Sequence, residues 1–269
     1  MKPVGVFDSG AGGLSIVAAI RTALPSLPIS YYADTAYAPY GPRSDAEIVA
    51  RTQACCARLL EQGVAALVVA CNTATASAID QVRQWAPVPV IGVEPGIKPA
   101  AACTRNGVVG VLATRATLAS RRYRDLMLRV QQQAPQVRFL EHAARGWVEL
   151  VEAGDLQSVH ARTLVREAVA PLLAQGADTL VLGCTHFPFL RPAIEQVAQG
   201  VELVETGPAV ARELQRRLPG PVAGEAPAQV IFEASGGTAQ FTALAGVLLA
   251  VARNTGRAHD ATRGATAGR

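Results

Sequence analysis

The sequence predicts an α/β protein in which parallel sheets lie between layers of helices. Three observations support this fold class. Short runs rich in Val, Ile and Leu alternate along the chain with segments of helical length. These runs are continuously apolar, as in strands that helices cover on both faces. Half of the 269 residues are apolar and 17% are charged, which is typical of a globular chain that buries a sizeable core.

Nine apolar runs are expected to form strands, and helical segments separate most of them. In chain order these strands are Val4–Phe7, Ile29–Ala33, Leu67–Ala70, Pro89–Val93, Val108–Leu112, Val137–Leu140, Thr179–Leu182, Glu202–Val204 and Val230–Ala234. Two segments with the length and composition of helices are Ser44–Gln62 and Leu156–Gln175. Ser44 and Glu47 have the spacing of a capping box, so the first of these helices should begin there.

Two pairs of similar segments indicate that the chain contains two related halves. "VGVFDSGAGG", from Val4, resembles "VGVLATRATL", from Val109, and the apolar runs that lead to Cys71 and Cys184 place these cysteines 113 residues apart. We therefore expect two similar parallel-sheet α/β lobes related by a pseudo-twofold axis, with a ligand site at their interface. The first lobe is predicted to comprise residues 1–97 and 207–252, and the second residues 98–206. Residues 253–269 are polar and are predicted to form a disordered tail.

The charge distribution argues against nucleic acid as a partner. The net charge of +4 is concentrated in residues 253–269, which carry four arginines and one aspartate and leave 21 basic and 20 acidic side chains elsewhere. Aromatic residues make up only 5% and do not alternate with basic ones, as stacking on bases would require. No apolar run approaches the ~20 residues of a membrane helix, and the N-terminus lacks the layout of a signal peptide. We expect a cytoplasmic protein without a membrane or nucleic-acid partner.

The residues that metals and common cofactors need are scarce. The five cysteines are odd in number and include no C-x-x-C pair, so neither a disulfide framework nor a zinc site is expected. The only lysines are Lys2 and Lys98, and a proline follows Lys98, which argues against the Schiff base of a pyridoxal-phosphate enzyme. The sequence therefore predicts chemistry without a metal or an organic cofactor.

Cys71 and Cys184 each follow an apolar strand and precede two polar residues, Asn72–Thr73 and Thr185–His186. In open parallel sheets, ligands bind beyond the carboxyl ends of the strands, where helix N-termini offer free N–H groups. Two thiols on opposite sides of one ligand could remove a proton from one face of a carbon and deliver another to the opposite face, which is racemisation. The helix N-terminus beside each cysteine is expected to favour the thiolate. Taken singly, each cysteine could instead be inert packing.

Three further stretches carry polar residues with either a functional or a structural explanation. Asp8 and Ser9 end the first strand in "FDSGAGG", whose glycines let the backbone turn and approach a ligand, but the two residues could simply cap the next helix. Tyr40 and Gly41 lie between prolines in a loop that could bind a ligand or only shape the connection. Glu152, in "WVELVEAG", is either a solvated helix residue or a partner of the histidine after the second cysteine.

Five stretches together resemble the bacterial glutamate racemase family in their order and spacing: "GVFDSGAGGLS", "YADTAYAPYGPRS", "VVACNTATASAI", "GVEPGIKPA" and "LVLGCTHFPFL". The resemblance runs from about Val4 to about Leu214. It implies two similar α/β lobes with the active site between them and cofactor-independent interconversion of L- and D-glutamate. It also implies that the D-glutamate supplies peptidoglycan, and hence cell-wall biogenesis and cell shape, and that the protein is a homodimer.

Carried over by position, the resemblance implies that Cys71 and Cys184 are the catalytic acid–base pair. Cys71 would deprotonate the D-isomer and Cys184 the L-isomer. Asp8 would support Cys71, while His186 and Glu152 would lie on the Cys184 side. The residues implied in holding the carboxylates and the ammonium of glutamate are Asp8, Ser9, Tyr40, Gly41, Asn72, Thr73, Thr185 and His186.

The chain departs from the family pattern in two places. Before "WVELVE", Ala144 and Arg145 stand where the family usually has Cys-Pro. Further on, Glu205 and Thr206 replace residues of a motif that resembles D-S-G in the family.

Three other functions fit parts of the pattern. An aspartate or hydantoin racemase would use the same scaffold and differ in how it holds the side-chain end of the substrate. A ligand-binding protein with this fold would show no turnover, and replacing either cysteine would leave its affinity largely intact. A hydrolase with one thiol needs a single nucleophile with a base and an oxyanion site, and it leaves the second cysteine unexplained.

Overall fold

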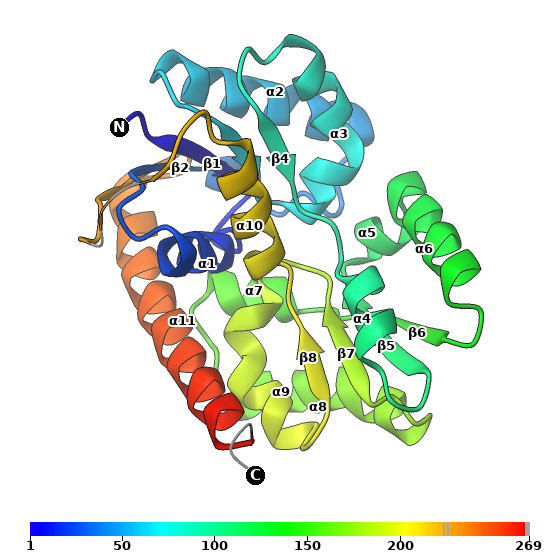
Figure 1. Cartoon of the computed structure of the whole chain (residues 1–269). Coiled ribbons are helices and arrows are strands. Elements are labelled where there is room, and N and C mark those ends of the chain that lie inside the picture. Colours follow the sequence, from blue (N-terminus) through cyan, green and yellow to red (C-terminus); the bar gives the residue numbers. More distant parts are fainter. Residues whose placement is uncertain (223, 225, 267–269) are drawn as a thin grey trace.

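Two parallel sheets organise the chain, as the sequence predicts (Figure 1). The computed structural model describes residues 1–222, 224 and 226–266. From edge to edge, the first sheet contains β4 (Val90–Gly92), β3 (Leu67–Val69), β1 (Val4–Asp8), β2 (Ile29–Ala33) and β9 (Val230–Ala234). The second contains β6 (Arg138–Ala143), β5 (Val108–Ala113), β7 (Thr179–Leu182) and β8 (Glu202–Val204). All neighbouring strands in both sheets are parallel.

The internal similarity in the sequence corresponds to a repeated strand order. The first sheet has the order β4-β3-β1-β2, and the second has the equivalent order β8-β7-β5-β6. Strand β9 is an addition to the first sheet, where it pairs with β2. The predicted fold class is therefore confirmed, and several strands, such as Ile29–Ala33 and Thr179–Leu182, have the bounds that the apolar runs predict.

Helices cover both faces of the sheets. They are α1 (Leu14–Ala23), α2 (Asp45–Glu61), α3 (Asn72–Trp85), α4 (Ile97–Cys103), α5 (Arg115–Ala119), α6 (Arg121–Gln133), α7 (Trp147–Glu152), α8 (Val159–Ala174), α9 (Arg191–Val197), α10 (Gly207–Arg217) and α11 (Thr238–Thr266), with 3-10 helices η1 (Thr35–Tyr37) and η2 (Phe187–Leu190). The capping box predicted at the start of α2 is present: Glu47 N–H donates to Ser44 Oγ, and Ser44 N–H donates to the Glu47 carboxylate. Among the described helices, none combines the length and apolarity of a membrane span.

The two lobes share one hydrophobic core. The largest cluster of buried apolar side chains runs from residues of the first lobe, such as Val6 and Ile16, to residues of the second, such as Leu180 and Phe187. Smaller clusters fill the other face of each sheet, beneath α2 and α3 in the first lobe and beneath α4 and α6 in the second. Helix α10 lies over the junction of the lobes, and α11 runs along their side, in contact with α1 and η2 (Figure 1). Shared burial of this kind fixes how the lobes face each other.

The C-terminal segment differs from the prediction of a disordered tail. Helix α11 continues to Thr266, so residues 253–266 are helical in the structure. Alanine and arginine, both good helix formers, are frequent there and account for the difference. Residues 267–269 of the predicted tail lie outside the described residues. The lobe boundaries proposed from the sequence stay a prediction.

Candidate active site

A cavity of about 370 Å³ lies between the carboxyl ends of the two sheets, and both Cys71 and Cys184 line it. Cys71 follows β3 and caps the N-terminus of α3, and Cys184 follows β7 after Gly183. Each cysteine is 7% exposed. The structure thus brings one thiol from each lobe to the same cavity.

Burial dominates the acid–base state of Cys71. Its Sγ lies 3.5 Å from Ser9 Oγ and accepts a hydrogen bond from the N–H of Ala74 at 3.4 Å, in the first turn of α3. Burial raises the pKa of the Cys71 thiol to about 12, the charge of Asp8 adds to this rise, and the two hydrogen bonds only partly oppose it. The N–H group in the first turn of α3 lowers this pKa, as expected for a helix N-terminus, but desolvation of a charged sulfur outweighs it, so the net pKa of Cys71 is raised.

Cys184 has a different partner, the imidazole of His186. His186 Nδ1 lies 3.6 Å from Cys184 Sγ, and its Nε2 lies 2.7 Å from Glu152 Oε1. Burial lowers the pKa of His186, but the hydrogen bonds with Cys184 and Glu152 outweigh it and hold this pKa well above its ordinary value. For Glu152, burial raises the pKa, but the hydrogen bond with His186 outweighs it, so the net pKa is lowered. The pair is an imidazolium and a carboxylate, and the imidazolium can stabilise negative charge on the Cys184 sulfur.

Asp8 lies behind the wall of the cavity and does not line it. The side chain is fully buried, and its carboxylate accepts hydrogen bonds from Gly10 N–H at 2.7 Å and from Thr185 Oγ1 at 3.3 Å. Burial raises the pKa of Asp8 to about 6, which leaves this carboxyl able to change its charge near neutral pH. Asp8 therefore acts on the cavity through Thr185 and the adjacent Ser9, which both line it.

The glycine-rich loop after β1 approaches the second lobe too closely for a side chain. A Cβ at Gly10 would collide with the Glu152 carboxylate, and a Cβ at Gly12 would collide with the His186 imidazole. Between them, Ala11 N–H donates to Glu152 Oε1 at 2.7 Å. The structure shows that Gly10 and Gly12 allow close contact between the lobes, while the approach of this loop to a ligand stays a prediction.

The loop that carries Tyr40 and Gly41 is braced by a partly buried ion pair between Arg51 and Asp34. Tyr40 Oη donates to Asp34 Oδ2 at 2.6 Å, and Arg51 donates to both carboxylate oxygens of Asp34, at 2.7 and 2.9 Å. The Arg51 guanidinium also lies over the ring of Tyr37, 3.7 Å from its centre. Because the Tyr40 hydroxyl already donates to Asp34, this loop is suited to bind a ligand through its backbone N–H groups.

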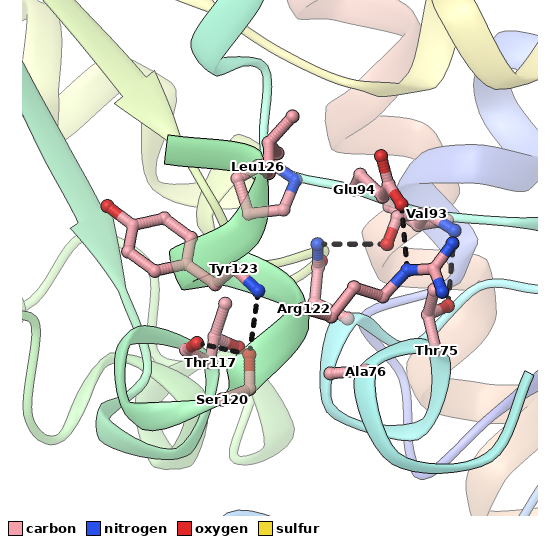
Figure 2. Close-up of a pocket in the computed structure, with 11 residues that line it drawn as sticks. Thr75, Ala76, Val93, Glu94, Thr117, Ser120, Arg122, Tyr123 and Leu126 are labelled. Atoms are coloured by element: carbon pink, nitrogen blue, oxygen red, sulfur yellow. Dashed lines mark hydrogen bonds and ion pairs between the residues drawn. The ribbon is translucent and has the colours of Figure 1, made fainter. Parts of the chain in front are cut away.

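Asn72 lines both the cavity and a smaller hollow of about 10 Å³, shown in Figure 2. Its Nδ2 donates to the carbonyl of Val93 at 3.4 Å, and its buried Oδ1 has no hydrogen-bond partner among the residues that the structure describes. Across this hollow, Arg122 of α6 binds Glu94 at 2.7 Å (Figure 2). Arg122 also binds Asp80 of α3 at 3.2 Å. This ion-pair bridge joins the second lobe to the helix whose first residues line the cavity.

Nine of the eleven predicted site residues line the cavity, namely Ser9, Tyr40, Gly41, Cys71, Asn72, Thr73, Cys184, Thr185 and His186. The other two, Asp8 and Glu152, contact Thr185 and His186 from outside it. In the described part of the chain, no three side chains of His, Cys, Asp or Glu are grouped as metal ligands would be.

The second lobe adds lining residues that were not among the predicted site residues. They follow β5 and β6 and include Arg115, Arg145 and Glu149. The signal was available, because the carboxyl ends of all parallel strands in a sheet lie at one edge. The ends of β5 and β6, which lie in the same sheet as β7, were therefore candidate positions.

Comparison with known proteins points to one family. A model of the Asp/Glu/Hydantoin racemase family matches residues 14–214. The glutamate racemase of Herpetosiphon aurantiacus is 53% identical over 218 residues, which are 81% of this chain and 85% of that protein. The glutamate racemase of Cupriavidus pinatubonensis is 49% identical over 217 residues, which are 80% of this chain and 79% of that protein.

Solved structures agree with the sequence relatives. The structure of Escherichia coli glutamate racemase in complex with L-glutamate and the activator UDP-MurNAc-Ala is 36% identical, covers 93% of this chain and 96% of its own, and has a TM-score of 0.82. Glutamate racemase from Thermus thermophilus, in complex with β-chloro-D-alanine, is 34% identical, covers 92% of this chain and 93% of its own, and has a TM-score of 0.76.

Proposed function

The chain belongs to the Asp/Glu/Hydantoin racemase family, and on this premise we propose that it interconverts L- and D-glutamate with Cys71 and Cys184 as the two proton-transfer groups. One observation carries the proposal: two thiols from equivalent strand ends of the two lobes line the same cavity. A pair of opposed acid–base groups is what inversion at a carbon centre requires.

In the L-to-D direction, the Cys184 thiolate removes the α-proton and the Cys71 thiol delivers its own proton to the opposite face. The α-C–H bond breaks as an S–H bond forms at Cys184, and the S–H bond of Cys71 breaks as the new C–H bond forms. The enzyme ends with a thiol at Cys184 and a thiolate at Cys71, which is the form that starts the reverse reaction. The raised pKa of Cys71 supports its role as the proton donor in this direction.

The carbanion between the two steps needs hydrogen-bond donors on its carboxylate. Thr73, at the start of α3, supplies a hydroxyl group in the cavity wall. Thr185, after β7, is assigned to the same carboxylate through its backbone N–H, because its hydroxyl donates to Asp8. We assign the second carboxylate to the backbone of Tyr40 and Gly41. The ammonium group can donate to Asn72 Oδ1, which would give this buried acceptor the partner it otherwise lacks.

His186 and Glu152 support the Cys184 side. His186 lines the cavity and contacts the sulfur, so it stabilises the thiolate that removes the proton. Glu152 acts through His186 and is a positioning residue, because it holds the imidazole in place and keeps it charged. Asp8 has the corresponding position near Cys71, where its charge affects the thiol.

The wider role follows from the family resemblance alone. We propose that the D-glutamate supplies peptidoglycan synthesis, that the reaction takes place in the cytoplasm without a cofactor, and that the protein works as a homodimer. The lobe boundaries of 1–97 with 207–252 and 98–206 belong to the same proposal.

The first experiment incubates the purified protein with L-glutamate in heavy water and follows optical rotation together with the α-proton signal. Inversion with deuterium incorporation is expected, and L-aspartate in parallel tests the closest alternative substrate. Exchange without inversion would mean that only one thiol is competent. No change with either amino acid would refute the proposed function and favour a binding protein.

Replacing either thiol tests the mechanism directly. Cys71→Ala and Cys184→Ala are each expected to lower turnover by at least ~10²-fold, the usual contribution of a general acid or base. Cys56→Ala is the matched control, since Cys56 is buried within α2 and does not line the cavity. Near-wild-type turnover in either active-site variant would show that the two-thiol assignment is wrong.

A further inference from the structure

Two arginines of the second lobe line the active-site cavity. Arg115 begins α5 after β5, and Arg145 lies between β6 and α7. Both side chains are exposed, so their guanidinium groups lie at the solvent side of the cavity wall. They are the only Arg or Lys side chains among the described lining residues.

Neither arginine has an acidic partner within ion-pair distance in the described part of the chain, in contrast to Arg51 and Arg122. The lining residue of opposite charge is Glu149, which is exposed. Deeper in the site, His186 is balanced by Glu152. The mouth of the cavity therefore has an excess of positive charge.

This excess matches the charge of the substrate in the proposed function. Glutamate has two carboxylates and one ammonium group, so it carries a net charge of −1 at neutral pH, and both isomers carry the same charge. Cations at the mouth of a cavity with low-dielectric walls raise the local concentration of an anion and the rate at which it enters.

We propose that Arg115 and Arg145 form an electrostatic entrance that draws the dicarboxylate substrate into the cavity and takes no part in proton transfer. This inference rests on the proposed function for the identity of the substrate. The two residues determine preference for an anionic over a neutral amino acid, and their effect is on capture, not on the chemical step.

The test compares R115Q/R145Q with wild type in steady-state racemisation of L- and D-glutamate at low and high ionic strength. At low salt, kcat/KM is expected to fall about three- to tenfold with kcat nearly unchanged. The difference should disappear near 1 M salt, where the Debye length is about 3 Å. E149Q should have the opposite effect and raise kcat/KM at low salt, because it removes the negative charge at the entrance.

A control with the same change in net charge is R129Q/R166Q, which alters two exposed arginines on α6 and α8 outside the cavity wall. It should behave as wild type. Equal kcat/KM and equal salt dependence in R115Q/R145Q and wild type would refute the entrance, as would an equal loss in the control.

Binding measurements separate this inference from the proposed function. Calorimetric titration with an equilibrated mixture of L- and D-glutamate measures binding without net turnover. At low salt, we expect R115Q/R145Q to bind glutamate more weakly than wild type and to bind neutral L-glutamine equally well. Unchanged glutamate binding refutes the entrance. Wild-type protein that binds glutamate but never racemises it refutes the proposed function and leaves the entrance supported.

Discussion

Replacing Glu152 by glutamine is expected to lower the free energy of unfolding, mainly through the loss of one charge. Glu152 Oε1 accepts hydrogen bonds at 2.7 Å from both His186 Nε2 and Ala11 N–H, and the side chain is 26% exposed. Glutamine keeps an oxygen for these donors but leaves the imidazolium without a counter-charge. A hydrogen bond to a charged group contributes about 1.5–3 kcal/mol and a neutral one about 0.5–1.5 kcal/mol. The free energy of unfolding near pH 6 should therefore fall by about 1–1.5 kcal/mol.

The pH dependence of this loss follows from the two pKa shifts. The folded-state pKa of His186 is raised, so its contribution is complete below the unfolded value of 6.5 and is lost as the pH rises through the folded value. The folded-state pKa of Glu152 is lowered, so its contribution is present above the unfolded value of 4.5 and is lost as the pH falls through the folded value. The difference between wild type and E152Q should be largest between these two unfolded values and should decline on both sides.

Urea denaturation of wild type and E152Q at pH 6 and pH 10 measures this difference. E167Q, which alters an exposed glutamate on α8, is the control and should match wild type at both values. Racemisation by E152Q should also slow by about tenfold in kcat/KM, since about 1.4 kcal/mol of charge stabilisation near Cys184 is lost. Both directions should slow equally, because the two enantiomers have the same free energy. A stability difference of the same size at pH 6 and pH 10 would refute the ion-pair argument.

Three further substitutions test the lobe contact, the buried carboxyl and the loop brace. Gly12→Ala should lower the free energy of unfolding by about 1–3 kcal/mol, because the new Cβ collides with the His186 imidazole. The control Gly246→Ala, which has open space around its Cβ, should not lower it, and thermal melting of both variants measures the difference. Asp8→Asn should stabilise the protein above pH 6 but not at pH 4, because burial raises the pKa of Asp8 to about 6 and the ionised carboxylate destabilises the folded state. Urea denaturation at both pH values measures this, and an equal change in the free energy of unfolding at both would contradict it. Tyr40→Phe should lower stability by about 1–3 kcal/mol through the loss of a buried hydrogen bond and should raise KM more than it lowers kcat, and an unchanged KM would argue against the brace.

The secondary structure could be predicted where local signals agree. Strands such as Thr179–Leu182 are short, mostly apolar runs bounded by polar or turn-forming residues, and the observed strand has the predicted bounds. Helix α2 begins where the capping box predicts. The prediction for β6, Val137–Leu140, was less accurate, because the observed strand runs from Arg138 to Ala143. Its position at the edge of the sheet allows polar side chains within the strand, and these weaken the apolar pattern.

Most residues of the site could be predicted from the sequence, but the pKa values of their side chains could not. Strand ends and triplets such as Cys71–Thr73 mark the edge of a sheet, so spacing in the sequence was enough to select them. The high pKa of Cys71 was not predictable, because desolvation depends on atoms from other parts of the chain. Arg115 and Arg145 were not predicted as site residues for a related reason, since an arginine at a strand-to-helix junction looks like any solvated residue until both lobes enclose the cavity.

The sequence by itself determined the layered α/β class, the repeated halves and the two cysteine triplets, because each depends on periodicity or spacing along a few neighbouring residues. Only the tertiary structure decided that Gly10 and Gly12 face the second lobe, that Glu152 holds His186, and which groups lie behind the cavity wall. These features depend on burial and on contacts between residues far apart in the chain, such as the hydrogen bond from Ala11 to Glu152. Burial and such contacts set charge states and close packing, and they arise only when the two lobes share one core.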